Sequence, residues 1–283
     1  MVVDHPFSIQ NGSGDPVRGN LRFQDDGRRK PLILICHGFN TNKDWGPFPY
    51  CGEFLADSGF ATIVFDFSHN GVGEEPGRFT EYSRFSKNTP GKELEDIQAV
   101  LDAVSDGLIG KECVDNTRIG MAGHSRGAGM SVLTAAADSR IRAIVLWSTV
   151  AVFLRLNDEE RRRWVEKGYH PLRYGNQRTM LRYDISVLND LEENRTRYDL
   201  EQGSRRLSVP ALFLHGDSDE IVPLEETLLL YRQGKSRRDL QIIKGADHTY
   251  GTEHPFRGTT PPLTTMLQLT KQWFEQYLEN KTT

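Results

Sequence analysis

The sequence predicts an α/β fold in which a mostly parallel central β-sheet carries helices on both faces. Short, continuously apolar runs alternate along the chain with longer amphipathic segments. Runs of this kind, without alternation of polar and apolar residues, are typical of parallel strands that are buried on both faces. Strands that alternate with helices are the pattern from which such sheets are built.

Each element follows from a local pattern. Two strands around a turn rich in Gly, Asn, Asp and Pro are predicted within residues 7–23. Buried strands are predicted at residues 31–38, 61–67, 116–125, 141–148, 209–216 and 240–247. Helices are predicted at residues 50–59, 92–104, 127–137 and 261–277; the second of these places five aliphatic side chains on one face, those of Leu94, Ile97, Val100, Leu101 and Val104.

One segment, residues 151–207, interrupts this alternation. It lacks a buried-strand run, is rich in Arg, Glu and Asp, and has helical character at residues 157–168 and 177–194. Its composition fits either a solvated polar insertion with a few packing aromatics or a cap over a pocket. We interpret it as a helical cap inserted into one discontinuous core domain, which residues 1–150 and 208–283 form.

Composition and charge exclude several classes of protein. The chain has 283 residues, and 35 Lys and Arg against 39 Asp and Glu leave a net charge of −4. This near balance argues against a nucleic-acid partner. The longest nearly apolar run, residues 143–153, is too short to span a membrane, and the first residues lack a signal-peptide pattern. With only three cysteines and no metal-ligand spacing among them, we expect a cytoplasmic protein without membrane association.

The strongest local motif is G-x-S-x-G at residues 123–127, with Ser125 at its centre. A predicted strand runs into this motif and a predicted small-residue helix follows it. A nucleophile elbow needs this strand–turn–helix context, because the sharp turn exposes the serine hydroxyl above the sheet edge. We therefore predict that Ser125 is a nucleophile.

A serine nucleophile needs a base within hydrogen-bond reach. His248 follows the predicted strand at residues 240–247, so it is expected at the same sheet edge as Ser125. Among the eight histidines, His254 is the main alternative, because it lies close to His248 in the sequence. We predict that His248 is the base.

The base in turn needs a carboxylate that orients its ring. Asp217, Asp219 and Glu220 follow the predicted strand at residues 209–216. An acid after one strand and a histidine after the next follow the chain order serine, acid, histidine. Within H-G-x-x-D-x-x-V, Asp219 occupies the marked position, and Asp217 stays open as an alternative.

The developing oxyanion needs preorganised donors. The backbone N–H of Arg126, directly after the nucleophile, is one candidate. The other candidate is the backbone N–H of Phe39, in the loop after the strand at residues 31–38. Further along, Trp45, Phe48 and Tyr50 either line an apolar pocket or belong to the core.

These motifs together resemble the serine α/β-hydrolases over nearly the whole chain. More narrowly, the chain is similar to bacterial cinnamoyl and feruloyl esterases and to dienelactone-hydrolase-like esterases. The segments that carry the resemblance are HGFNTNKD, GFATIVFDFSHNGVGE, ELEDIQAVLDAV, GHSRGAG, LHGDSDEIVP and KGADHTY. The resemblance implies the α/β-hydrolase fold, the roles given above for Ser125, Asp219 and His248, and a cap at residues 151–207.

The chain departs from these esterases at two places. Residues 68–71 read Ser-His-Asn-Gly where a glycine-histidine-glycine turn is usual, and Arg126 replaces a glutamine or methionine. The Arg126 cation either favours an anionic substrate or forms a structural ion pair.

We predict a carboxylic-ester hydrolase that acts on a small-molecule ester through an acyl-enzyme, with no metal and no organic cofactor. A serine peptidase or an acyltransferase would use the same machinery, so both stay open. A non-catalytic binding protein on the same fold is a further alternative, which the presence of serine, acid and histidine together disfavours.

Overall fold

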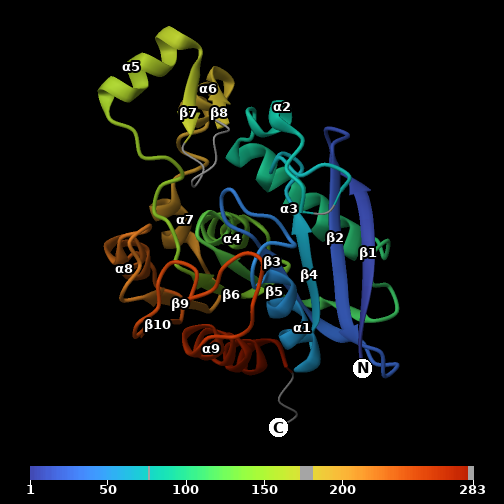
Figure 1. Ribbon diagram of the computed structural model, residues 1–283. Helices are drawn as coiled ribbons and strands as arrows, with labels where there is room; N and C mark the ends of the chain where they lie inside the picture. The colour runs from blue at the N-terminus through green and yellow to red at the C-terminus, as the bar shows by residue number, and fades with distance from the viewer. Residues whose placement is uncertain (76, 173–180, 280–283) are drawn as a thin grey trace.

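A single large sheet organises the computed structural model, which describes residues 1–75, 77–172 and 181–279. The sheet has eight strands in the order β1-β2-β4-β3-β5-β6-β9-β10 (Figure 1). In chain order these strands are β1 (Val2–Gln10), β2 (Pro16–Gln24), β3 (Lys30–Cys36), β4 (Ala61–Asp66), β5 (Val114–His124), β6 (Ile141–Trp147), β9 (Ala211–Gly216) and β10 (Arg238–Ile243).

Most neighbouring strands in this sheet run parallel. β1 and β2 form an antiparallel hairpin, and β2 also pairs antiparallel with β4. The remaining five pairs are parallel, and they are β4 with β3, β3 with β5, β5 with β6, β6 with β9 and β9 with β10. The predictions of an α/β fold with a mostly parallel sheet and of a hairpin within residues 7–23 are confirmed.

Helices cover both faces of the sheet and create two cores. Leu32 and Leu34 of β3 belong to one core, and the intervening Ile33 and Ile35 belong to the other. The first core includes side chains from α3 (Pro90–Ser105), α4 (Arg126–Ala137) and α8 (Leu224–Arg232). The second includes side chains from α1 (Phe48–Asp57) and α9 (Pro261–Leu278). Because alternate residues of a strand point to opposite faces, the double covering explains the continuous apolar runs.

The four predicted core helices form, with ends that differ by one or two residues from the prediction. Local capping sets such ends: Pro90 occupies the first position of α3, and the Thr89 hydroxyl accepts a hydrogen bond from the Lys92 N–H. The short helix α2 (Tyr82–Phe85) and the helix α8 were not predicted from the sequence.

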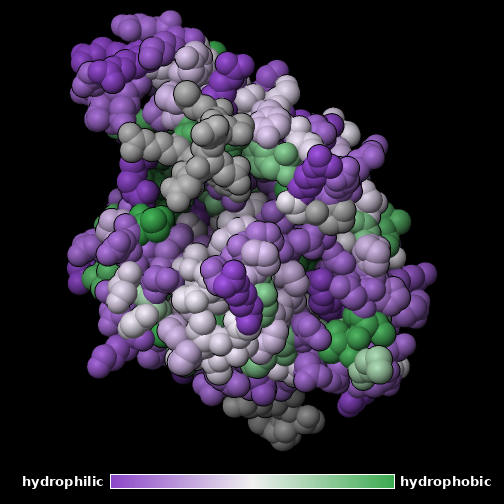
Figure 2. Space-filling view, viewed as in Figure 1, coloured by the Kyte–Doolittle hydropathy of each residue, from purple (hydrophilic) through white to green (hydrophobic). Residues whose placement is uncertain are grey.

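Between β6 and β9 the chain forms α5 (Asp158–Lys167), β7 (Tyr169–Leu172), β8 (Leu181–Asp184), α6 (Ile185–Glu193) and α7 (Leu200–Arg206). The part from α5 to α6 projects from the sheet at the top of the view in Figure 1, and Figure 2 shows that its outer surface is strongly hydrophilic. It has a small core of its own, formed by Trp164, Tyr183, Val187 and Leu188, against which Phe39 also packs. We call residues 158–193 of the described chain the cap.

The helix predicted at residues 157–168 is confirmed by α5, but the helix predicted at residues 177–194 is partly wrong. Residues 177–180 lie outside the described residues, and residues 181–184 form β8, which pairs antiparallel with β7. Leu181 and Tyr183 are buried while Arg182 is exposed, so the side chains alternate as in a half-buried strand. The helix starts only at Ile185, where the Asp184 carboxylate accepts a hydrogen bond from the Ser186 N–H.

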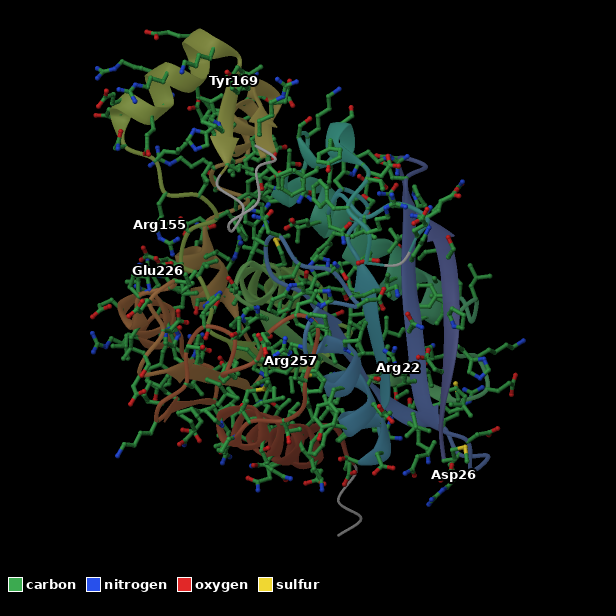
Figure 3. The ribbon with its side chains drawn as sticks, viewed as in Figure 1. Arg22, Asp26, Arg155, Tyr169, Glu226 and Arg257 are labelled. Carbon is green, nitrogen blue, oxygen red and sulfur yellow. The ribbon has the colours of Figure 1, made fainter. Side chains whose placement is uncertain are left out.

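The division into a core and an inserted cap at residues 151–207 stays a prediction. Within that range, α7 packs on α4, since Gly203 lies against Val132 and Leu133. Ahead of the cap, Glu226 of α8 accepts a hydrogen bond from the Ala151 N–H (2.7 Å) and pairs with Arg155. Figure 3 shows these two labelled side chains facing each other at the base of the cap. Among the described helices, none combines the length and apolarity needed to cross a bilayer.

The two-sided burial of β3 yields a stability prediction. Leu34→Ala removes a fully buried side chain and should lower the free energy of unfolding by about 2–5 kcal/mol. Ile242→Ala is the matched control on the edge strand β10, where the side chain is 43% exposed, and it should cost less than about 1 kcal/mol. Urea denaturation followed by circular dichroism measures both, and equal losses would contradict the difference in burial between the central strand β3 and the edge strand β10.

Candidate active site

Ser125 lies at the turn between β5 and α4. Its backbone has φ 55° and ψ −118°, a conformation that non-glycine residues rarely adopt. The Ser125 N–H donates to the carbonyl of Trp147 at the end of β6 (2.8 Å), which fixes the turn against the neighbouring strand. The strand–turn–helix context predicted for the G-x-S-x-G motif is therefore present, with the strain typical of a nucleophile elbow.

The two glycines of the motif are required by backbone contacts. A Cβ atom on Gly123 would lie 2.3 Å from the carbonyl oxygen of Gly127. A Cβ atom on Gly127 would lie 2.4 Å from the carbonyl oxygens of both Cys36 and His37. These neighbours are backbone atoms of the first turn of α4 and of the end of β3, so they cannot move aside as a flexible side chain could. The motif therefore needs glycine at both positions, because the backbone of the elbow is packed this closely on itself and on the end of β3.

Asp219 and His248 form a hydrogen-bonded pair beside the elbow. His248 Nδ1 lies 2.8 Å from Asp219 Oδ2, and the Asp219 side chain is fully buried. The other Asp219 oxygen accepts hydrogen bonds from the N–H groups of Ile221 and Val222. Burial alone would raise the pKa of Asp219, but the hydrogen bond from His248 and the two N–H donors bring the pKa down to about 2.

An ionised Asp219 accepts a hydrogen bond from the Nδ1–H of His248, and this tautomer leaves Nε2 free to take a proton. The His248 side chain is 14% exposed, whereas that of Asp219 is inaccessible. The pair therefore has the arrangement of a base with its orienting acid.

His124, the residue before the nucleophile, connects the elbow to the loop of His248. His124 Nε2 lies 2.8 Å from the His248 carbonyl oxygen, which can only accept, so Nε2 carries the proton. The two imidazole rings lie 4.7 Å apart between centroids. Burial lowers the pKa of His124 to about 3, which keeps its ring neutral beside His248. The sequence analysis did not identify this role, because nothing in the G-x-S-x-G pattern specifies the contact of the second residue.

The two alternatives named from the sequence have other partners. Asp217 is exposed and accepts a hydrogen bond from the Gly245 N–H (2.6 Å). His254 Nδ1 accepts from the Gly46 N–H (3.1 Å), and its ring stacks on Trp45. The structure thus brings Asp219 and His248 together, and gives Asp217 and His254 structural roles in loops.

The loop after β3 lies against the elbow. A Cβ atom on Gly38 would lie 3.4 Å from the Cβ of Ser125, so the loop that contains Phe39 approaches Ser125 closely. The Arg126 N–H opens α4, and the first N–H groups of a helix have no partner within the helix. The roles of these two N–H groups as oxyanion donors stay a prediction, and both belong to segments that lie against the elbow.

A buried carboxylate holds this loop in place. Asp66, the last residue of β4, accepts hydrogen bonds from the Lys43 N–H (2.9 Å) and from Asn70 Nδ2 (2.8 Å). Burial raises the pKa of Asp66 to about 6, and the two hydrogen bonds limit the rise. Asn70 belongs to residues 68–71, where the sequence departs from the esterases that it resembles. Its amide therefore helps Asp66 to hold the loop after β3.

The side chain of Arg126 forms a buried ion pair with Glu93 of α3. Arg126 Nε lies 2.9 and 2.8 Å from the two carboxylate oxygens of Glu93. Asn88 Nδ2 also donates to Glu93 (2.8 Å). Of the two roles that the sequence left open for Arg126, the structure shows the ion pair. Glu93 was missed because an acidic residue in the first turn of a helix is more often a solvated dipole partner.

The aromatic residues after the loop belong mainly to the core. Phe48 is buried in the second core, and Trp45 and Tyr50 pack against it, with Tyr50 also stacked on Phe256. Of the two interpretations left open for these residues, the structure favours the core.

The chain belongs to the alpha/beta hydrolase fold family, whose sequence model matches residues 31–182, more than half of the chain. This match includes Phe39 and Ser125 and ends before Asp219.

Two relatives are similar in sequence. A protein of the traX–finO intergenic region of Escherichia coli is 33% identical over 144 residues, which cover 51% of this chain and 44% of that protein, so the match spans less than half of the relative's length. YitV of Bacillus subtilis, described as a candidate esterase, is 26% identical over 281 residues, which cover 95% of this chain and 98% of YitV.

Two solved structures share the fold at low identity. Est1E of Butyrivibrio proteoclasticus superposes with a TM-score of 0.70 at 21% identity, over 96% of this chain and 98% of Est1E. Dienelactone hydrolase of Anabaena variabilis gives a TM-score of 0.67 at 18% identity, over 98% of this chain and 99% of that one. Both structures show that this chain has the same fold.

The contact between His124 and the His248 loop yields a prediction about positioning. His124→Leu removes the donor to the His248 carbonyl and should lower kcat by about tenfold, the size expected for one hydrogen bond. His124→Gln can place an amide N–H near the same position and should stay within about threefold of the unmodified protein. Steady-state kinetics on an ester substrate measures both, and identical losses in the two variants would contradict a role for this donor.

Proposed function

We propose that the protein hydrolyses carboxylic esters through an acyl-enzyme formed on Ser125. The observation that carries the proposal is the 2.8 Å contact between His248 Nδ1 and the buried Asp219 carboxylate, beside a serine in a strained elbow. A serine hydroxyl is a weak nucleophile unless a base takes its proton, and this pair has the geometry of such a base with its orienting acid.

The reaction follows from these groups in two halves. In the first half, the Ser125 hydroxyl attacks the ester carbonyl while His248 Nε2 takes its proton. His248 then gives this proton to the departing alcohol, which leaves the acyl group on Ser125. In the second half, water attacks the acyl carbonyl, His248 takes the proton of water, and the carboxylic acid departs as the proton returns to Ser125.

Preorganised donors stabilise the negative oxygen in both halves. The N–H groups of Phe39 and Arg126 are the proposed pair, because both belong to segments that touch the elbow. Asp66 supports the first by holding its loop, and the start of α4 orients the second. Donors fixed before the reaction cost no reorganisation when charge develops.

We favour an ester over an amide as the substrate because the chain is similar to YitV, which is described as a candidate esterase. The alignment with YitV covers nearly the full length of both chains. A peptidase and an acyltransferase would use the same residues and differ in leaving group or acceptor. A panel of phenolic esters, short acyl esters, lactones and aminoacyl amides, assayed with and without an added alcohol acceptor, separates these activities.

Removing the nucleophile tests the proposal directly. Ser125→Ala should lower kcat for a short-chain para-nitrophenyl ester by more than about a thousandfold, because no acyl-enzyme can form. Circular dichroism should be unchanged, since alanine fills less space than serine in the same turn. A fluorophosphonate probe should label the unmodified protein at Ser125 and leave the variant unlabelled; retained activity or labelling in the variant would refute the assignment.

The acid is tested by a matched pair of substitutions. Asp219→Asn keeps the shape but places an uncharged amide against His248, and kcat should fall by about 10³–10⁴-fold. Asp217→Asn changes an exposed loop residue in the same way and should alter kcat by less than about threefold. A larger loss in Asp217→Asn than in Asp219→Asn would reverse the assignment.

A further inference from the structure

The chain leaves the sheet next to the nucleophile. β6 ends at Trp147, whose carbonyl accepts the hydrogen bond from the Ser125 N–H, and residues 148–157 then lead to α5. We call residues 148–157 the linker. Its Phe153 packs against the first core, whereas its Leu156 packs against the small core of the cap. The linker therefore connects the elbow to the cap.

The Phe153 ring packs on the first turn of α4. Its centre lies 5.1 Å from the guanidinium carbon of Arg126. Its Cε1 atom lies 3.0 Å from the place that a Cβ atom on Gly129 would occupy, so the missing side chain at Gly129 lets the ring approach the helix. Phe153 therefore lies against the turn that begins with the Arg126 N–H, one of the two proposed oxyanion donors.

One carboxylate holds the linker on both sides of Phe153. Glu226 Oε2 accepts a hydrogen bond from the Ala151 N–H (2.7 Å), and Oε1 accepts one from Arg155 Nε (2.7 Å). Figure 3 shows the Arg155 and Glu226 side chains facing each other. Ala151 precedes Phe153 by two residues, and Arg155 follows it by two. Because both carboxylate oxygens are bonded, the linker is tied to α8 immediately before and after Phe153.

The helix α8 is itself anchored beside the acid. The N–H of Val222, two residues before α8 begins, donates to Asp219 (2.9 Å). The Val222 carbonyl oxygen lies 3.0 Å from Nε2 of the fully buried His215. Nδ1 of the same ring lies 2.8 Å from the hydroxyl of Thr227, the residue after Glu226. Glu226 therefore fastens the linker to a part of the chain that hydrogen bonds fix relative to Asp219.

We propose that Glu226 is a positioning residue for the reaction. By holding the linker, it keeps Phe153 packed on the first turn of α4 and so keeps the Arg126 N–H aimed at the developing oxyanion. Oxyanion stabilisation depends on donors that are fixed before the reaction, and small displacements of such groups lower the rate. This inference rests on the proposed ester hydrolysis at Ser125 and on the proposed donor role of the Arg126 N–H.

Of the two bonds to Glu226, the one from the Ala151 N–H carries the effect. Ala151 is 7% exposed, so loss of its acceptor would leave a buried N–H unpaired. The Arg155 side chain is 49% exposed, and ion pairs with such access to solvent contribute little. An amide at position 226 still offers an oxygen to the Ala151 N–H, which makes Glu226→Gln the conservative variant.

Steady-state kinetics with a short-chain para-nitrophenyl ester tests the role of Glu226. Glu226→Ala should lower kcat by about tenfold and change KM by less than about threefold, because the donor acts on charge that develops only in the transition state. In Glu226→Gln, kcat should stay within about threefold of the unmodified protein. Glu225→Ala is the matched control, because Glu225 is exposed in the same turn of α8, and kcat should be unchanged. An unchanged kcat in Glu226→Ala, or equal losses in Glu226→Ala and Glu226→Gln, would overturn the proposal.

A double-substitution cycle tests whether Glu226 acts through Phe153. Phe153→Ala alone should lower kcat by about tenfold, and combining it with Glu226→Ala should lower kcat no further. Two independent losses of packing would instead multiply, to about a hundredfold. That multiplied loss, or an unchanged kcat in Phe153→Ala, would overturn the proposal whatever the single Glu226 variants show.

Hydrogen exchange separates this proposal from the proposed reaction. In Glu226→Ala, the Ala151 amide loses its acceptor and should exchange at least about tenfold faster than in the unmodified protein. In Glu226→Gln, its rate should stay within about threefold. That result, together with no ester hydrolysis by the unmodified protein, would overturn the reaction and support the hold of Glu226 on the linker. An unchanged Ala151 rate in Glu226→Ala would overturn the proposal even where esters are hydrolysed.

Discussion

The backbone contact between the elbow and the end of β3 is the constraint on which the rest of the site depends. Carbonyl oxygens of Cys36 and His37 lie where a side chain on Gly127 would be. This close approach places the start of α4 next to the loop that contains Phe39, so one contact positions both Ser125, the proposed nucleophile, and the two proposed N–H donors. The positive φ of Ser125 is a cost that the buried sheet around the turn offsets.

Around this contact, buried polar side chains connect loops that would otherwise be independent. His124 binds the loop of His248, and Asp66 binds the loop of Phe39. Asp96 extends the same principle, because it accepts from Asn11 and from the Ser68 N–H and so joins the β1–β2 turn to the end of β4. Each of these groups gives up solvation on burial, and the hydrogen bonds that it forms offset part of this loss only at the observed loop positions, which makes these positions specific.

Periodicity and strand ends were sufficient to predict the sheet, four core helices and the elbow with its acid and base candidates. These features follow from local patterns, since parallel strands bring their carboxyl ends to one edge. The hairpin of β7 and β8 was missed because four half-buried residues, 181–184, carry too short an alternation to outweigh the helical pattern that follows. The pairing of Arg126 with Glu93 and the role of His124 depend on contacts between distant segments, and no local pattern encodes such contacts.

The position of the cap in the chain has a consequence for how such a protein diverges. β6 and β9 are neighbours in the sheet, with Leu146 opposite Phe213. The residues between these two strands therefore form an insertion that starts and ends at the same place in the sheet. The entropy of closing a loop grows only slowly with its length. Within this insertion α7 is tied to the core because it packs on α4, whereas the cap packs a small core of its own and can lengthen, shorten or change its sequence with less effect on the sheet. Under the proposed function, a change in the cap can therefore alter which ester is accepted while the sheet and its two cores are preserved.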